Sequence, residues 1–309
     1  MKKKTVCMLL SAVLSISMFT ACSADSSTNI EPGNQEAVTE NQEAFGEFDV
    51  SELISVYSRE DGSGTRGAFV ELFGIEQKNE AGEKVDYTTV EAVITNSTDV
   101  MMTSIAGDVY GIGYISLGSL NNTVKAVKID GAQASVENIK EGTYTVARPF
   151  NIATSGEGNE LTQDFINFIM SAEGQAIIEE KGYIAVAGTE SFSTNGVAGK
   201  IVVGGSSSVT PVMEKLIETY LALNVNAEIE LSSSDSSTGM SQTAEGIIDI
   251  GMASRAIKDS ELESGLTGIT IAMDGIAVIV NHENPAEDLS SEAVKAIFTG
   301  EAYQWDEVK

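Results

Sequence analysis

The chain has 309 residues, of which 42% are hydrophobic, so it is long and apolar enough for one large domain or for two lobes with buried cores. Its 46 Asp and Glu residues outnumber its 18 Lys and Arg residues, which gives a formal net charge of −28. This balance argues against nucleic-acid binding and against capture by an anionic membrane, because no basic stripe is available to neutralise phosphates.

The first 22 residues have the pattern of a secretory signal. A basic start is followed by an apolar stretch over residues 6–19, which is too short for a comfortable transmembrane helix. The small residues that end in Cys22 resemble the lipobox of bacterial lipoproteins, which implies that Cys22 carries an acyl anchor such as palmitate. Residues 23–46 are polar and acidic and predict a flexible tether.

From about residue 50, short β-rich runs alternate with segments of helical periodicity. Strands are predicted at 53–57, 112–117, 123–129, 200–205, 226–231, 248–253 and 269–281. Helices are predicted at 66–73, 160–182, from Pro211 onward, at 240–248 and at 290–298. The alternation predicts an α/β protein with largely parallel sheets. The small, polar segment 187–199 predicts a linker between two unequal stretches.

Three loops rich in Ser, Thr and Gly each connect a predicted strand to a predicted helix, at residues 60–66, 204–211 and 232–242. The first N–H groups of a helix lack intrahelical partners and carry partial positive charge, so such loops suit anions. One such loop alone is more often a simple helix cap. Three of them, one flanked by Arg59 and Arg66, predict a site for a small oxyanion.

Enzyme interpretations have little support in the sequence. The one histidine, His282, lies in a polar turn, and Ser63 has no histidine near it in the sequence. The chain contains no G-x-S-x-G, Walker A or H-E-x-x-H motif and no Cys/His cluster with metal-ligand spacing. We therefore expect no catalytic residue, no metal and no cofactor.

Six stretches carry a resemblance to a known family: SREDGSGTR, GSSSVTP, DIGMASR, MDGIAVIVN, FTGEAYQW and INFIMSAEGQAIIEEKGY. They resemble segments of the phosphate-binding proteins that feed phosphate ABC transporters, over nearly all of 50–309. The order differs, because SREDGSGTR here precedes GSSSVTP and would ordinarily follow the FTGEAYQW segment. This order implies a circular permutation, joined through 187–199. A truncated or tandem product that completes its lobes with another chain is the alternative.

The resemblance implies an α/β, two-lobed, periplasmic-binding-protein-like (type II) fold with a hinge of two crossing strands near 147–154 and 274–281. One lobe would combine 47–149 with 278–309, and the other would span 150–277. The ligand-binding residues that it implies for phosphate are Arg59, Asp61, Ser63, Gly64, Thr65, Ser207, Ser208, Ser236 and Ser254. Some family members have Asp where Ser254 stands, and that Asp accepts the proton of phosphate. Whether the site discriminates between phosphate and sulfate is therefore open, and Asp61 is another candidate to accept the proton of phosphate.

The function implied by the resemblance is an extracytoplasmic binding protein, lipid-anchored at the cell membrane, that captures inorganic phosphate and delivers it to the permease of an ABC transporter. We expect a monomer that touches the membrane only through its lipid anchor. Three alternatives stay open at this point: a binder of another tetrahedral oxyanion such as sulfate, a surface-anchored phosphate sensor, and a phosphate-releasing enzyme.

Overall fold

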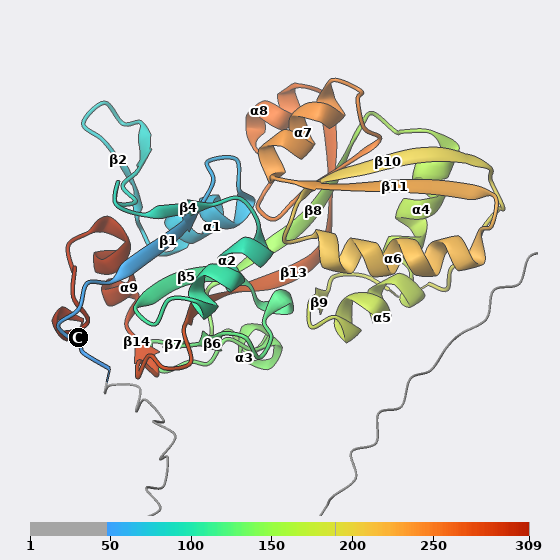
Figure 1. Cartoon of the computed structure of the whole chain (residues 1–309). Helices are drawn as coiled ribbons and strands as arrows, with labels where there is room; N and C mark the ends of the chain where they lie inside the picture. Colours follow the sequence, from blue (N-terminus) through green and yellow to red (C-terminus); the bar gives the residue numbers. More distant parts are fainter. Residues whose placement is uncertain (1–47, 189, 309) are drawn as a thin grey trace, which may run out of the picture. The chain divides into compact units, whose positions relative to one another are not determined.

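The computed structural model describes residues 48–188 and 190–308. The predicted signal segment, the tether and Cys22 lie outside the described residues. Among the residues that are described, no helix is both long enough and apolar enough to cross a membrane. The described part forms one compact unit by itself (Figure 1).

The elements follow in chain order. The strands are β1 (Ser55–Arg59), β2 (Glu76–Lys78), β3 (Lys84–Asp86), β4 (Val93–Thr95), β5 (Gly111–Ser116), β6 (Lys125–Ala126), β7 (Lys128–Ile129), β8 (Ala147–Ser155), β9 (Ile184–Ala185), β10 (Gly199–Ser206), β11 (Ala227–Ser234), β12 (Ile250–Ala253), β13 (Leu266–Val280) and β14 (Asp288–Leu289). The α-helices are α1 (Gly64–Leu72), α2 (Thr98–Ala106), α3 (Val136–Lys140), α4 (Glu160–Met170), α5 (Ala172–Glu180), α6 (Thr210–Leu223), α7 (Ser236–Ala244), α8 (Asp259–Glu263) and α9 (Ser291–Thr299). Two 3₁₀ turns, η1 (Leu117–Ser119) and η2 (Trp305–Glu307), complete the set.

The main sheet has the strand order β11-β10-β12-β8-β13-β5-β1-β4. The predicted parallel pairing is correct toward both ends, where β1 pairs in parallel with β4 and β5, and β10 pairs in parallel with β11 and β12. It is wrong in the centre, because β8 and β13 pair antiparallel with each other and with their outer neighbours. Antiparallel neighbours need no helical crossover between them, so strand–helix alternation in the sequence could not reveal this pairing.

The two long central strands connect the two halves of the sheet, as predicted for the hinge. β13 pairs with β8 along its first part and with β5 along its last part, from Ile276 to Val280. Figure 1 shows both strands running from one group of elements into the other. The chain therefore crosses between the two groups twice within this sheet, once on β8 and once on β13.

Two large hydrophobic cores lie on either side of these crossings, and a third, small cluster lies between β8, β12 and α7. The first is built from residues between Val56 and Val146 together with residues from Ile276 onward, and Phe69 stacks on Tyr114 within it. The second is built from residues between Phe150 and Ala272. We call the elements around these cores the first lobe and the second lobe. Since each lobe buries its own apolar residues, the lobes can rotate relative to each other without exposing either core.

The long helix predicted at 160–182 is in fact two helices. Ser171 adopts an extended conformation between α4 and α5, and its hydroxyl accepts a hydrogen bond from the N–H of Gly174. A Cβ at Gly174 would lie 2.1 Å from the carbonyl oxygen of Phe168, so only glycine allows α5 to pack this closely on the end of α4. Helical periodicity continues across the break, which is why the sequence pattern did not show it.

The start of the described chain lies beside its end. Leu53 forms an isolated antiparallel bridge with Gln304, and the N–H of Ile54 donates to the carbonyl of Tyr303 at 2.8 Å. Phe48 packs against Trp305 with ring centroids 6.1 Å apart. The two ends of the described chain are therefore neighbours within the first lobe.

Candidate functional site

The loop between β1 and α1 is the first part of the site. β1 ends at Arg59, at the carboxyl edge of the parallel strands of the first lobe, and α1 begins at Gly64. Ser63 caps this helix, because its hydroxyl accepts the N–H of Arg66 at 3.3 Å. The N-terminus of α1 therefore opens at the carboxyl edge of the sheet, which is where α/β proteins commonly hold anions.

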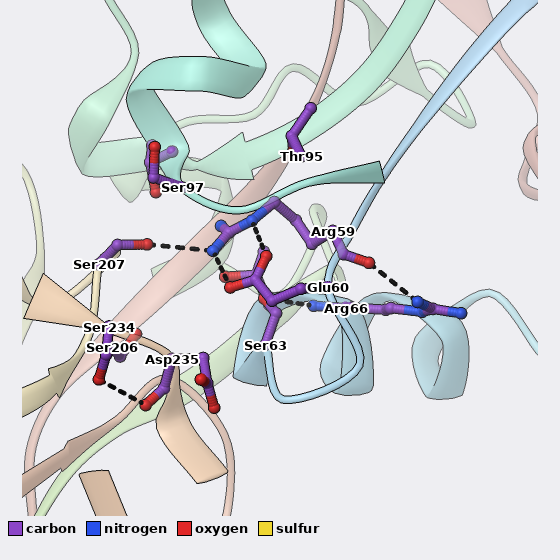
Figure 2. A network of polar contacts seen from close by, with 12 residues as sticks. Arg59, Glu60, Ser63, Arg66, Thr95, Ser97, Ser206, Ser207, Ser234 and Asp235 are labelled. Atoms are coloured by element: carbon purple, nitrogen blue, oxygen red, sulfur yellow. Dashed lines mark hydrogen bonds and ion pairs between the residues drawn. The ribbon is translucent and has the colours of Figure 1, made fainter. Parts of the chain in front are cut away.

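Arg59 reaches from this loop to the second lobe. Its side chain is 2% exposed, and its Nη2 donates to the hydroxyl of Ser207 at 3.1 Å (Figure 2). Its Nε and Nη2 also hold the two carboxylate oxygens of Glu60, each at 2.8 Å. This forked arrangement is the geometry with which a guanidinium binds a carboxylate or a phosphate. A buried cation with this geometry therefore lies where the two lobes meet.

Two loops of the second lobe face Arg59. Ser207 and Ser208 lie between β10 and α6, and the N-terminus of α6 has no side-chain cap. Ser236 begins α7, which Asp235 caps by accepting the N–H of Thr238 at 2.9 Å. Uncapped N–H groups at the start of α6 are donors that a ligand can use.

Hydroxyl groups from the two lobes contact each other directly. Thr65 and Ser208 lie 2.8 Å apart, oxygen to oxygen, and Thr65 and Ser254 lie 3.5 Å apart. The hydroxyl of Ser236 accepts the backbone N–H of Ser254 at 3.1 Å. All four residues are at most 1% exposed. The structure thus brings together hydroxyls that are 143 to 189 residues apart in the sequence.

Gly64 lies at a close contact between the lobes. A Cβ at this position would lie 2.4 Å from the hydroxyl oxygen of Ser236 and 2.9 Å from that of Ser254. The backbone of α1 can meet these serines only because the residue has no side chain. This contact explains why the loop needs glycine at this position.

Asp61 is the predicted site residue that the structure does not bring to the hydroxyl cluster. Its side chain is 97% exposed and accepts a 2.7 Å hydrogen bond from Nη1 of Arg66. Arg66 also binds Asp86 at 2.8 Å, so its charge is neutralised outside the cluster. Asp61 does not pair with Arg59, because Glu60 holds that guanidinium. The other predicted contact residues lie around the point where the lobes meet, and they are Arg59, Ser63, Gly64, Thr65, Ser207, Ser208, Ser236 and Ser254.

A hollow of about 470 Å³ opens beside the β1–α1 loop. It is lined by Asp61, Gly62 and Ser63 from the first lobe and by Ser237 and Arg255 from the second, among others. Arg255 is itself paired with Glu261, with 2.6 Å between Nη2 and Oε1. The hollow is therefore bounded by residues of both lobes, and Ser63 and Ser237, which line it, are chain neighbours of Gly64 and Ser236.

Sequence reasoning missed three residues of this site. Glu60 holds Arg59, the hydroxyl of Thr98 lies 3.3 Å from that of Ser208, and the hydroxyl of Ser206 donates to Ser254 at 2.9 Å. Ser206 could have been predicted as a site residue, since it belongs to the same serine run as Ser207. Thr98 begins α2, a helix that the sequence pattern did not predict, so no signal pointed to it.

The arrangement suits an anion that is held without reaction. It combines one buried guanidinium, hydroxyl donors and two helix N-termini, which together replace the hydration shell of an oxyanion. Within the described ranges, no group of three or more His, Cys, Asp and Glu residues could hold a metal ion. His282 contacts the carbonyl of Asn122 at 2.9 Å, away from this cluster.

Several known proteins are similar to this chain in sequence and structure. A family model described as the PBP superfamily domain matches residues 38–173 and 190–309. The "Phosphate-binding protein PstS 2" of Streptococcus agalactiae is 46% identical over 311 residues, which cover all of this chain and 99% of that protein. The crystal structure of a phosphate-binding protein of a phosphate ABC transporter from Streptococcus pneumoniae aligns with a TM-score of 0.66 at 43% identity, over 83% of this chain and all of that chain. The "Phosphate-binding protein PstS" of Bacillus subtilis is 30% identical over only 113 residues, or 36% of this chain and 38% of that protein.

Proposed function

The chain belongs to the PBP superfamily, among the phosphate-binding proteins of ABC transporters, and from this premise we propose that it captures inorganic phosphate between its lobes on the extracytoplasmic side and delivers it to a membrane permease. It is a binding protein and not an enzyme. The observation that carries the proposal is the contact of Arg59 with Ser207 across the lobes, beside the hydroxyls of Thr65 and Ser208.

Phosphate would be held by groups from both lobes at once. Arg59 would supply the charge, and the helix N-termini and hydroxyls at Ser63, Gly64 and Thr65 would bind from the first lobe. Ser207, Ser208, Ser236 and Ser254 would bind from the second. Because neither lobe holds the whole set, binding favours the closed state, and the lobes would close by rotation about β8 and β13. Asp61 would contribute through its backbone, since its side chain points to solvent.

Selectivity between phosphate and sulfate depends on an acceptor for the proton of phosphate. Ser254 has a hydroxyl, which can both donate and accept, where a carboxylate would only accept. A neutral hydroxyl does not repel fully ionised sulfate. We therefore propose that discrimination against sulfate is weaker here than in a site with a buried carboxylate at this position, and that sulfate is a second, poorer ligand.

The first prediction is that ligand-stripped protein of residues 23–309 binds one phosphate per chain in a calorimetric titration, and that sulfate competes at higher concentration. A sulfate titration that stays silent would contradict the account of Ser254 and leave the phosphate site intact. A folded sample that binds neither anion would contradict the proposed function itself.

We also propose a lipid anchor at Cys22 with 23–46 as its tether, and a monomer as the functional unit. The monomer is supported by the site, since both of its halves come from one chain. The lobe boundaries that we propose are those of the sequence analysis: 47–149 with 278–309, and 150–277. Loss of membrane association in a Cys22→Ala variant would test the anchor.

We further propose that the chain is circularly permuted relative to more distant family members. The adjacency of Ile54 and Tyr303 supports this proposal, since a permutation requires neighbouring ends. The short alignment with the Bacillus subtilis protein supports it as well, because a change of segment order interrupts a collinear alignment. Segment 187–199 would then be the join between the original ends.

The second prediction concerns a chain reopened between Asn195 and Gly196, with residue 308 joined to residue 48 through a short glycine linker. We expect it to fold and to bind phosphate within about tenfold of the original, because cuts in exposed loops with adjacent ends are tolerated. Circular dichroism and calorimetry would measure this. A rearranged chain that stays unfolded while the original folds would contradict the permutation.

A further inference from the structure

A group of buried polar atoms lies at the two central strands and the elements beside them, separate from the hydroxyl cluster. Among the described residues, buried side-chain atoms without a hydrogen-bond partner include Nε and Nη1 of Arg148 and the hydroxyls of Ser116, Ser119 and Tyr183. Arg148 is 2% exposed. Unpartnered donors are costly in a protein interior, so a guanidinium that keeps two of them needs an explanation.

The strand register places Arg148 between the carboxyl edges of the two lobes. Arg148 on β8 lies opposite Asp274 on β13. Two residues further along β13, Ile276 lies opposite Ser116, which is the last residue of β5. In the other direction along β8, Asn151 lies opposite Ala253, the last residue of β12. Arg148 is therefore located on the floor of the space between the lobes, at the level where the strands of both lobes end.

Asp274 holds the guanidinium from one side only. Its Oδ2 accepts from Nη2 of Arg148 at 3.0 Å, and its Oδ1 accepts the N–H of Gly118 at 3.4 Å. The Asp274 side chain is fully buried, which raises the pKa of its carboxyl group to about 6. The pair fixes the position of Arg148, whose Cζ also lies 5.4 Å from the ring centroid of Phe150, while Nε and Nη1 keep no hydrogen-bond partner.

Arg148 also lies within the electrostatic field of Arg59. Burial lowers the pKa of Arg148, Asp274 raises it, and the charge of Arg59 lowers it again. Glu60 pairs with Arg59 and Asp274 pairs with Arg148, and an anion near both guanidinium groups would stabilise the two charges further. The proposed phosphate position at Arg59 supplies such an anion.

We propose that Arg148 is a second, affinity-determining cation of the phosphate site, which attracts the bound anion from the floor of the cleft while Asp274 holds it in place and partly offsets its charge. This inference rests on the proposed function. It distinguishes Arg148 from Arg66 and Arg255, which are paired with acids that are 15% to 97% exposed, whereas the partner of Arg148 is fully buried.

The third prediction tests this role with charge changes of opposite sign. Asp274→Asn leaves the charge of Arg148 without its counter-charge, and we expect phosphate affinity at low salt to rise about tenfold. The double variant Arg148→Met/Asp274→Asn removes both charges, and we expect affinity about fivefold below that of the original protein, since the cation that attracts the anion is lost. Glu287→Gln, an exposed acid of the first lobe paired with Lys125, is the matched control and should leave affinity unchanged.

A purely structural role would give a different pattern. Both changes would then lower the melting temperature without moving phosphate affinity in opposite directions, and that result would overturn the inference. If Asp274→Asn does not fold, the double variant decides, because it leaves no buried charge unpaired: unchanged affinity overturns the inference, and a fivefold loss supports it. Absence of phosphate binding by the original protein would instead identify a failure of the proposed function.

Discussion

Replacement of Arg59 by glutamine is expected to weaken phosphate binding about a thousandfold, which corresponds to about 4 kcal/mol. Arg59 is the buried cation that contacts both lobes, through Glu60 in its own loop and through Ser207 across the cleft. Its removal takes away the charge and the forked donor geometry together. Glutamine keeps one donor but has no charge with which to offset the cost of removing water from the anion.

The neighbouring arginine provides the comparison for this fourth prediction. Arg66→Gln should cost less than about tenfold, because Arg66 is paired with Asp61 and Asp86 at the edge of the hollow. Arg59→Lys should fall between the two, since lysine keeps the charge without the fork. Calorimetric titration of phosphate measures the affinities, and thermal melts show whether each variant is folded. Equal losses for the Arg59 and Arg66 variants would contradict the assignment.

The sequence predicted the polar loops better than the sheet that positions them. The run from Ser206 to Ser208 and the segment from Arg59 to Thr65 carry glycine and hydroxyl residues whose spacing reports a helix N-terminus directly. Residue patterns of this kind can be recognised in the sequence without knowledge of the fold. The contact between the two loops cannot be recognised in this way, because strand pairing brings Thr65 and Ser208 together across a separation of 143 residues.

The polar residues on the floor of the cleft also could not be identified from the sequence alone. Asp274 lies within a strand that the sequence pattern predicted, and Arg148 lies within one that only the family resemblance implied, yet neither residue was singled out. Their importance depends on the antiparallel register of β8 with β13, which places them opposite each other. Nothing in the local sequence around either residue reports that pairing, since an alternating or apolar run fits parallel and antiparallel neighbours equally well.

Substitution of Gly64 by alanine is the fifth prediction, and it tests closure without changing any charge. The added methyl group would overlap the hydroxyls of Ser236 and Ser254, both of which are fully buried. Overpacking of this kind costs about 3 kcal/mol at its upper end, so phosphate binding should weaken about a hundredfold. Gly64 begins α1, where alanine favours the helix, so the first lobe itself should keep its stability.

Gly67 gives the matched control within the same helix. A Cβ there would meet no atom closer than the Cδ of Arg255 at 3.9 Å, so Gly67→Ala should bind phosphate as the original protein does. Small-angle scattering with and without phosphate would separate the two variants by closure, because the Gly64→Ala chain should stay open at phosphate concentrations that close the Gly67→Ala chain. Equal affinity and equal closure of both variants would mean that phosphate is held in an arrangement in which the lobes do not meet at Gly64. The cross-lobe hydroxyl contacts would then belong to a state without ligand.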